Sequence, residues 1–121
     1  MKLRIRASSL RLRVTRGEVD RLRQGSPIVE LVPFGTTSLR YALRVAAVPA
    51  MKARFEAGCI EVEVPTELAR TWLDTEQVGL AAEQQVGDGG PLQILLEKDF
   101  ACLKPREGED DGDAFPNPAG S

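Results

Sequence analysis

The chain has 121 residues, a formal net charge of −2, 42% hydrophobic residues and 28% charged residues. This length and composition are those of one folded globular domain with a core of its own. The chain contains no histidine, which excludes Ser-His-Asp and Cys-His nucleophile arrangements and the zinc ligand sets that need an imidazole nitrogen. The composition thus favours a binding protein without a cofactor over an enzyme.

Alternation of apolar and charged residues predicts strands along most of the chain. Residues 10–14 alternate apolar with basic side chains, and residues 60–64 alternate apolar with acidic ones, so each strand has one apolar and one charged face. Further strand patterns are found at 2–6, 27–34, 39–45, 52–56, 78–86 and 92–96.

Two helices interrupt the strands. Thr15 and Glu18 have the spacing of a capping box, which predicts a helix from there to about Gln24 with Gly25 as its stop. A second helix is predicted from Pro65 to Asp74. The positions predicted to be buried lie on the apolar faces of these strands and helices: Leu12, Val14, Leu22, Tyr41, Leu43, Val62, Trp72, Ile94 and Leu96.

The order of these elements suggests an internal repeat. Residues 9–46 and 59–98 each read as a β-α-β-β unit, with matching apolar positions at offsets of about 50 residues. We therefore predict an α+β fold, a curved antiparallel sheet or small barrel of about seven or eight strands with two helices. Residues 1–103 are expected to form the single domain, and residues 104–121 an acidic, Pro- and Gly-rich tail.

Both ends of the chain resemble a known group of proteins. The segment Glu97–Leu103, a following acidic stretch and Phe115-Pro116-Asn117-Pro118 are similar to the C-terminal signature of a family of small uncharacterised bacterial proteins. Residues 1–15 resemble the opening strand pair of the same family. The resemblance implies a bacterial protein of one domain, and it implies no catalytic residue.

The location of the protein is predicted from what its N-terminal residues lack. Residues 1–6 alternate instead of forming an apolar signal-peptide core, and no apolar run approaches the ~20 residues of a membrane span. We expect a cytoplasmic protein that does not contact membranes. Cys59 and Cys102 are then expected to be reduced.

The positive charge of the chain is concentrated in its first half. Residues 1–50 hold ten lysines and arginines against three acids, and the remainder holds six against fifteen. The outward faces of the basic strands suggest a site for an anion or phosphate-containing ligand. Its candidate residues are Arg4, Arg6, Arg11, Arg13, Arg40 and Arg44.

Two observations limit this interpretation. The basic strands carry no outward aromatic residue for base stacking, so we do not expect nucleic acid as the ligand. Ion pairs of Arg11 and Arg13 with Glu61 and Glu63 would also account for the charges without any ligand.

A metal site is a further possibility. Asp110, Asp111 and Asp113 supply oxygen ligands for a hard cation, although without the spacing of an EF-hand. Cys59 and Cys102 would bind a soft metal or form a redox disulfide if the fold brought them together. A solvated tail and packed thiols are the simpler interpretations.

The sequence leaves three functions open. The first is a binding or accessory protein that acts through contacts with an unidentified protein partner, and the second is the anion-binding protein described above. The third is a metal-dependent phosphohydrolase that resembles the triphosphate tunnel enzymes, because Glu61-Val62-Glu63 is similar to their paired-glutamate strand. The acidic residues 107–113 are predicted to dock on the basic face of the same chain.

Overall fold

A computed structural model describes residues 1–99. Its eight strands and two helices, with one short 3₁₀ turn, follow the predicted order. They are β1 (Lys2–Arg6), β2 (Ser9–Val14), α1 (Arg16–Arg23), β3 (Ile28–Pro33), β4 (Ser38–Ala46), β5 (Lys52–Glu56), β6 (Cys59–Pro65), α2 (Thr66–Asp74), β7 (Gly79–Gln85), η1 (Gly87–Gly89) and β8 (Pro91–Lys98). The acidic residues 107–113 and their predicted docking lie outside the described residues.

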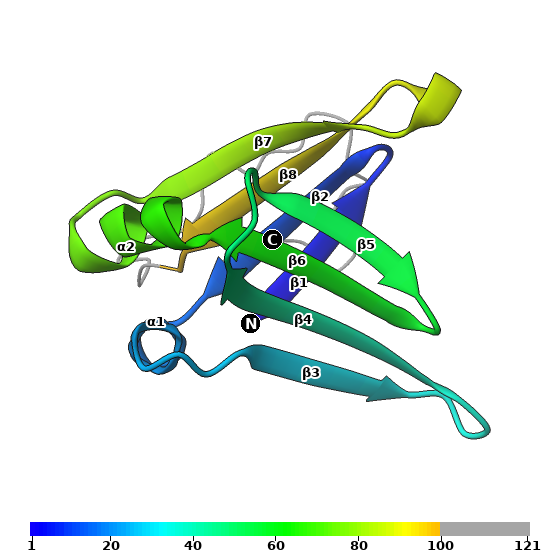
Figure 1. The fold of residues 1–121 in the computed structure, drawn as a ribbon. Helices are drawn as coiled ribbons and strands as arrows, with labels where there is room; N and C mark the ends of the chain where they lie inside the picture. Colours follow the sequence, from blue (N-terminus) through cyan, green and yellow to red (C-terminus); the bar gives the residue numbers. More distant parts are fainter. Residues whose placement is uncertain (100–121) are drawn as a thin grey trace, which may run out of the picture.

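The strands form two four-stranded sheets that pack face to face (Figure 1). Sheet A has the order β1-β2-β8-β7, and sheet B has the order β3-β4-β6-β5. The fold is α+β as predicted, but it is neither a single curved antiparallel sheet nor a closed barrel. Both sheets are mixed, because their central pairs, β2 with β8 and β4 with β6, are parallel.

Each sheet combines hairpins from both halves of the chain. Each half has the order hairpin, helix, hairpin, which adds a leading strand to the predicted β-α-β-β unit. The first hairpin of one half lies beside the second hairpin of the other half in the same sheet. Because the halves are interleaved in this way, neither half holds a complete sheet.

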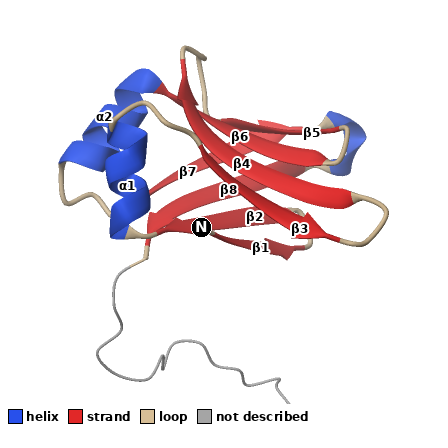
Figure 2. Ribbon diagram, turned by 90° about the horizontal axis from the view of Figure 1, so that it is seen from below, coloured by secondary structure: helices blue, strands red, loops and turns tan. Residues whose placement is uncertain are grey.

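Both helices lie at one end of the two sheets, and the turns of the four hairpins lie at the other end (Figure 2). Thr15 caps the start of helix α1, because its hydroxyl accepts from the Glu18 backbone while the Glu18 carboxylate accepts from the Thr15 backbone at 2.9 Å. The helix ends before Gly25, which has a φ of 88°. The predicted capping box and helix stop are thus confirmed.

The core lies between the sheets and beneath the helices. All the positions predicted to be buried are buried except Tyr41. Tyr41 is half-buried because its hydroxyl donates to the Met1 carbonyl at 3.3 Å, at the margin between the sheets. Trp72 is 1% exposed, and its indole nitrogen donates to the Val78 carbonyl at 3.0 Å.

Polar contacts join the edge strands of the two sheets along both sides of the sandwich. On one side, the Gln84 amide of β7 accepts from the Ala53 backbone nitrogen of β5 at 2.7 Å and donates to its carbonyl at 3.0 Å. On the other side, the Met1 ammonium group beside β1 donates to Glu30 of β3 at 2.9 Å. Side chains therefore connect the sheets where no strand pairing does.

No helix within residues 1–99 combines the length and the hydropathy that crossing a membrane requires.

Candidate functional site

Five cations project from the outer surface of sheet A, on β1 and β2. Leu10 and Leu12 of β2 point into the core, so alternation turns their neighbours outward. The antiparallel register then sets Arg4 opposite Arg11 and Lys2 opposite Arg13. We call this surface the basic face, and its members are Lys2, Arg4, Arg6, Arg11 and Arg13.

Two carboxylates from the end of β8 neutralise part of the basic face. Arg11 donates to the Glu97 carboxylate through Nε at 2.9 Å and Nη2 at 2.8 Å, and Arg13 Nε lies 3.5 Å from the same oxygen. Asp99 lies 3.5 Å from the Lys2 ammonium group. Within residues 1–99, the exposed Arg4 and Arg6 form no ion pair. The face therefore keeps an excess of positive charge beside its most exposed arginines.

The other two predicted arginines lie elsewhere. Arg40 and Arg44 belong to β4 in sheet B, so the predicted set of six does not form one surface. Sequence patterns assigned each of these strands an outward basic face but did not reveal that the strands belong to different sheets. The structure thus brings together Arg4, Arg6, Arg11 and Arg13 only.

The predicted pairing of Arg11 and Arg13 with Glu61 and Glu63 is wrong, because the two pairs of residues lie on different sheets. Both glutamates are instead held by arginines of sheet B. Arg44 contacts Glu61 at 3.2 Å and also binds Glu63, and Arg54 reaches Glu61 at 2.5 Å. The hydrogen bond from Arg54 contributes most to lowering the pKa of Glu61, and it outweighs the effect of burial.

These ion pairs also bear on the phosphohydrolase interpretation. The outward carboxylates of Glu61-Val62-Glu63 are already bound to Arg44 and Arg54, and the two open sheets form no tunnel around them. No group of three or more potential metal ligands occurs among residues 1–99. Cys59 is a half-buried free thiol at the start of β6, and Cys102, Asp110, Asp111 and Asp113 lie outside the described residues.

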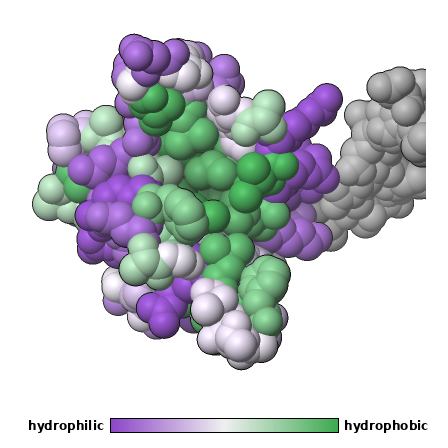
Figure 3. Space-filling model, turned by 90° about the vertical axis from the view of Figure 1, so that its right-hand side faces the viewer, coloured by the Kyte–Doolittle hydropathy of each residue, from purple (hydrophilic) through white to green (hydrophobic). Residues whose placement is uncertain are grey.

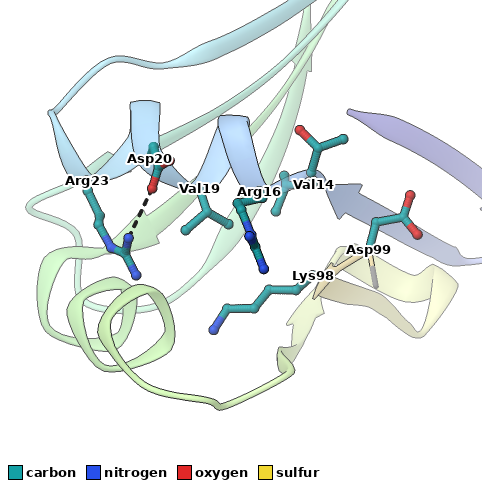
Figure 4. A pocket seen from close by; sticks show the side chains of 8 residues that line it. Val14, Arg16, Val19, Asp20, Arg23, Lys98 and Asp99 are labelled. Carbon is teal, nitrogen blue, oxygen red and sulfur yellow. Dashed lines mark hydrogen bonds and ion pairs between the residues drawn. The ribbon is translucent and has the colours of Figure 1, made fainter. Parts of the chain in front are cut away.

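A pocket of about 470 Å³ lies where α1 meets the ends of β2 and β8 (Figure 4). Three of its lining residues, Arg16, Arg23 and Lys98, are cations, and Asp20 and Asp99 are its acids. Arg23 is held by Asp20 at 3.1 Å. The pocket adjoins the basic face through Asp99, the carboxylate that also contacts Lys2.

The Lys98 amine lies in an unusual environment within this pocket. It donates to the Thr75 carbonyl at 2.7 Å and lies 6.0 Å from the centre of the Trp72 ring. Burial, followed by the charge of Arg23, lowers the pKa of Lys98. Sequence reasoning missed this cluster because it depends on the parallel pairing of β2 with β8, which sets Val14 beside Lys98.

Comparison with known proteins shows which family the chain belongs to. The model of a family of unknown function, DUF7009, matches residues 1–119. The chain belongs to the DUF7009 family. This agrees with the predicted relation to an uncharacterised family. No curated protein matches the chain. The DUF7009 match assigns no activity or site residue.

Proposed function

We propose that this DUF7009 protein binds an extended anion carrying several phosphate groups on its basic face. The observation that carries the proposal is the register of β1 and β2, which sets cations directly opposite each other twice, Arg4 opposite Arg11 and Lys2 opposite Arg13. Like charges directly opposite each other destabilise a sheet. A bound polyanion would turn this repulsion into attraction.

The arrangement of the cations favours a ligand with several charges. Outward residues on one strand repeat about every 6.6–6.8 Å, and neighbouring strands lie about 4.8 Å apart, so the basic face forms a grid of positive charge. Arginine, which supplies four of its five cations, binds phosphate oxygens through two parallel hydrogen bonds. The outward positions of β1 and β2 hold no aromatic side chain, so we expect recognition of phosphate rather than of bases.

The test is the binding of inorganic polyphosphate to the full chain at low salt. Arg4→Gln and Arg11→Gln are each expected to weaken binding roughly tenfold, because each removes a charge-assisted contact. Arg40→Gln is the matched control, since it removes an exposed arginine from the outer surface of sheet B. The affinity for polyphosphate should fall steeply with added salt, because salt cations compete with the arginines for the phosphate groups.

A second measurement separates binding from folding. Without ligand at low salt, Arg4→Gln should raise the melting temperature slightly, because it relieves the repulsion from Arg11. A variant that is at least as stable as the wild type but binds polyphosphate more weakly would support the proposal. Equal affinity of the wild type, Arg4→Gln and Arg11→Gln, or an equal loss with Arg40→Gln, would refute it.

We also propose that the two halves of the chain derive from one duplicated hairpin-helix-hairpin unit. The support is that equivalent hairpins occupy equivalent places, since the order β1-β2-β8-β7 becomes β5-β6-β4-β3 when the halves are exchanged. The test is an alignment of family members in which the segment equivalent to residues 2–46 is compared with the segment of the same protein equivalent to residues 52–98. Without any such similarity, the shared order of elements would be a coincidence of topology.

A further inference from the structure

The end of the sandwich that carries the hairpin turns exposes side chains from the core-facing side of its strands. Along β3 and the turn after it, the apolar residues Ile28, Val32 and Phe34 are 1%, 37% and 67% exposed. On β5 the exposure rises from Ala53 at 6% to Phe55 at 68%. The apolar interior therefore continues to the surface at this end.

This exposed apolar surface draws on both sheets. We call it the hairpin end, and its members are Ile5, Val32, Phe34, Phe55 and Val86. Figure 3 looks onto this end and shows apolar residues across the middle of the surface with polar residues around them. Apolar patches with a polar rim are typical of sites of protein association. Helices α1 and α2 cover the opposite end, and among residues 1–99 the only helical segment at this end is the short η1 of the β7–β8 hairpin (Figure 2).

The charges at the rim suggest which protein binds there. Arg6 and Glu56 occupy equivalent positions in the equivalent β1–β2 and β5–β6 hairpins, each next to an exposed apolar residue, Ile5 or Phe55. Each is followed by an alanine with positive φ, 49° at Ala7 and 50° at Ala57. In the described part of the chain, neither Arg6 nor Glu56 forms an ion pair.

In a twofold dimer, residue i of one protomer contacts residue j of its partner, and j contacts i. An apolar patch with Arg6 at one end and Glu56 at the other satisfies this rule, because Arg6 of each protomer then meets the partner's Glu56. We infer that the hairpin end binds a second copy of this chain, with the apolar residues at the centre and two Arg6–Glu56 ion pairs at the rim. This inference goes beyond the proposed anion binding and does not depend on it.

The first test is the mass of the full chain in solution, measured by sedimentation velocity from low to high micromolar concentration. We expect twice the mass of one chain at the upper concentrations. Phe55→Ser should weaken the dimer at least roughly tenfold, because it removes a large apolar side chain from the interface. Leu31→Ser is the matched control, since Leu31 is 57% exposed on the outer side of β3, away from the patch.

The second test reverses the rim charges. Arg6→Glu alone and Glu56→Arg alone each place like charges together twice in the dimer, so each should weaken it about tenfold or more. The double variant should recover affinity close to that of the wild type. The mass of one chain at every concentration would overturn the inference. Residues 100–121 or another protein would then be the candidate to cover the hairpin end. A dimer unaffected by Phe55→Ser, or one whose double variant does not recover, would also overturn it.

Discussion

The Glu18 carboxylate accepts a hydrogen bond from the Met1 ammonium group at 2.5 Å, and it is the same carboxylate that caps helix α1 at Thr15. Glu18 is 5% exposed, so this charged contact is almost fully removed from water. It ties the start of β1 to the first turn of α1. One side chain thereby joins the edge of sheet A to the helical end of the sandwich.

Because of this contact, we expect the free energy of unfolding to fall both toward acid and toward alkaline pH. Burial alone would raise the pKa of Glu18, but the hydrogen bonds from Met1 and Thr15 outweigh burial and lower it. Burial alone would likewise lower the pKa of the Met1 ammonium group, and the contacts with Glu18 and Glu30 raise it. The Glu18 contribution is present above its unfolded pKa and lost at lower pH, and the Met1 contribution is present below its unfolded pKa and lost at higher pH.

Glu18→Gln should therefore reduce the free energy of unfolding by about 1–3 kcal/mol near neutral pH. The difference from the wild type should be largest between about pH 5 and 8 and shrink toward acid and alkali. Urea unfolding at a series of pH values measures it. A difference that stays constant over the whole range would mean that Glu18 acts through its shape and not through its charge.

Trp72→Ala should reduce the free energy of unfolding by about 3–5 kcal/mol, because it leaves a cavity between α2 and the sheets. The Trp72 side chain is among the largest that are fully buried, and its hydrogen bond to Val78 would be lost as well. Leu68→Ala on the same helix is the control, since Leu68 is 46% exposed, and its effect should stay within about 0.5 kcal/mol. Thermal melts in which the two variants lose equal stability would contradict this assignment of the helix faces.

Arg44→Ala should destabilise the protein by about 2 kcal/mol, because it leaves the 5% exposed Glu63 without its cation. A double-mutant cycle between Arg44 and Glu63 should therefore give a clear coupling energy. The corresponding cycle between Arg11 and Glu63 should give none beyond about 0.3–0.5 kcal/mol, since these residues lie on different sheets. Coupling of equal size in both cycles would mean that the sheets are assembled differently.

Gly79→Ala should destabilise the protein by about 1–3 kcal/mol, because the new Cβ would lie 2.8 Å from the Leu96 carbonyl oxygen on the paired strand. Gly17→Ala offers the opposite case. Its Cβ would meet no atom within 4 Å beyond its chain neighbours and the backbone of its own helix, and a helical alanine is favoured over glycine by about 0.5–1 kcal/mol. Unfolding curves should thus move in opposite directions, and a neutral Gly79→Ala would show that β7 is free to move away from β8.

Local patterns were enough to predict the strands and the two helices found within residues 1–99. The alternation of Leu10, Leu12 and Val14 gave the inner face of β2, and the spacing of Thr15 and Glu18 gave the start of α1. Tyr41 was assigned to the core because alternation places it inward, but alternation does not show that its hydroxyl reaches the Met1 carbonyl. These features depend on neighbours in the chain or on one face of one strand.

The candidate site was predictable only in part, for a related reason. Arg4 and Arg11 belong to one hairpin, so their juxtaposition follows from a short turn. Glu97 reaches Arg11 across 86 positions of sequence, through the parallel pairing of β2 with β8. Pairing between such distant strands leaves no local pattern, and for the same reason the pocket at Lys98 and the separation of Arg44 from the basic face were missed.

The contact between Gln84 and Ala53 has a consequence for solubility. β5 is an edge strand, and the exposed backbone of an edge strand is a template on which strands of other molecules add. The Gln84 amide occupies the free donor and acceptor of Ala53 as a neighbouring strand would, with 2.7 and 3.0 Å contacts. A single side chain thus protects the first part of β5 from edge-to-edge pairing, while leaving the adjoining hairpin end open.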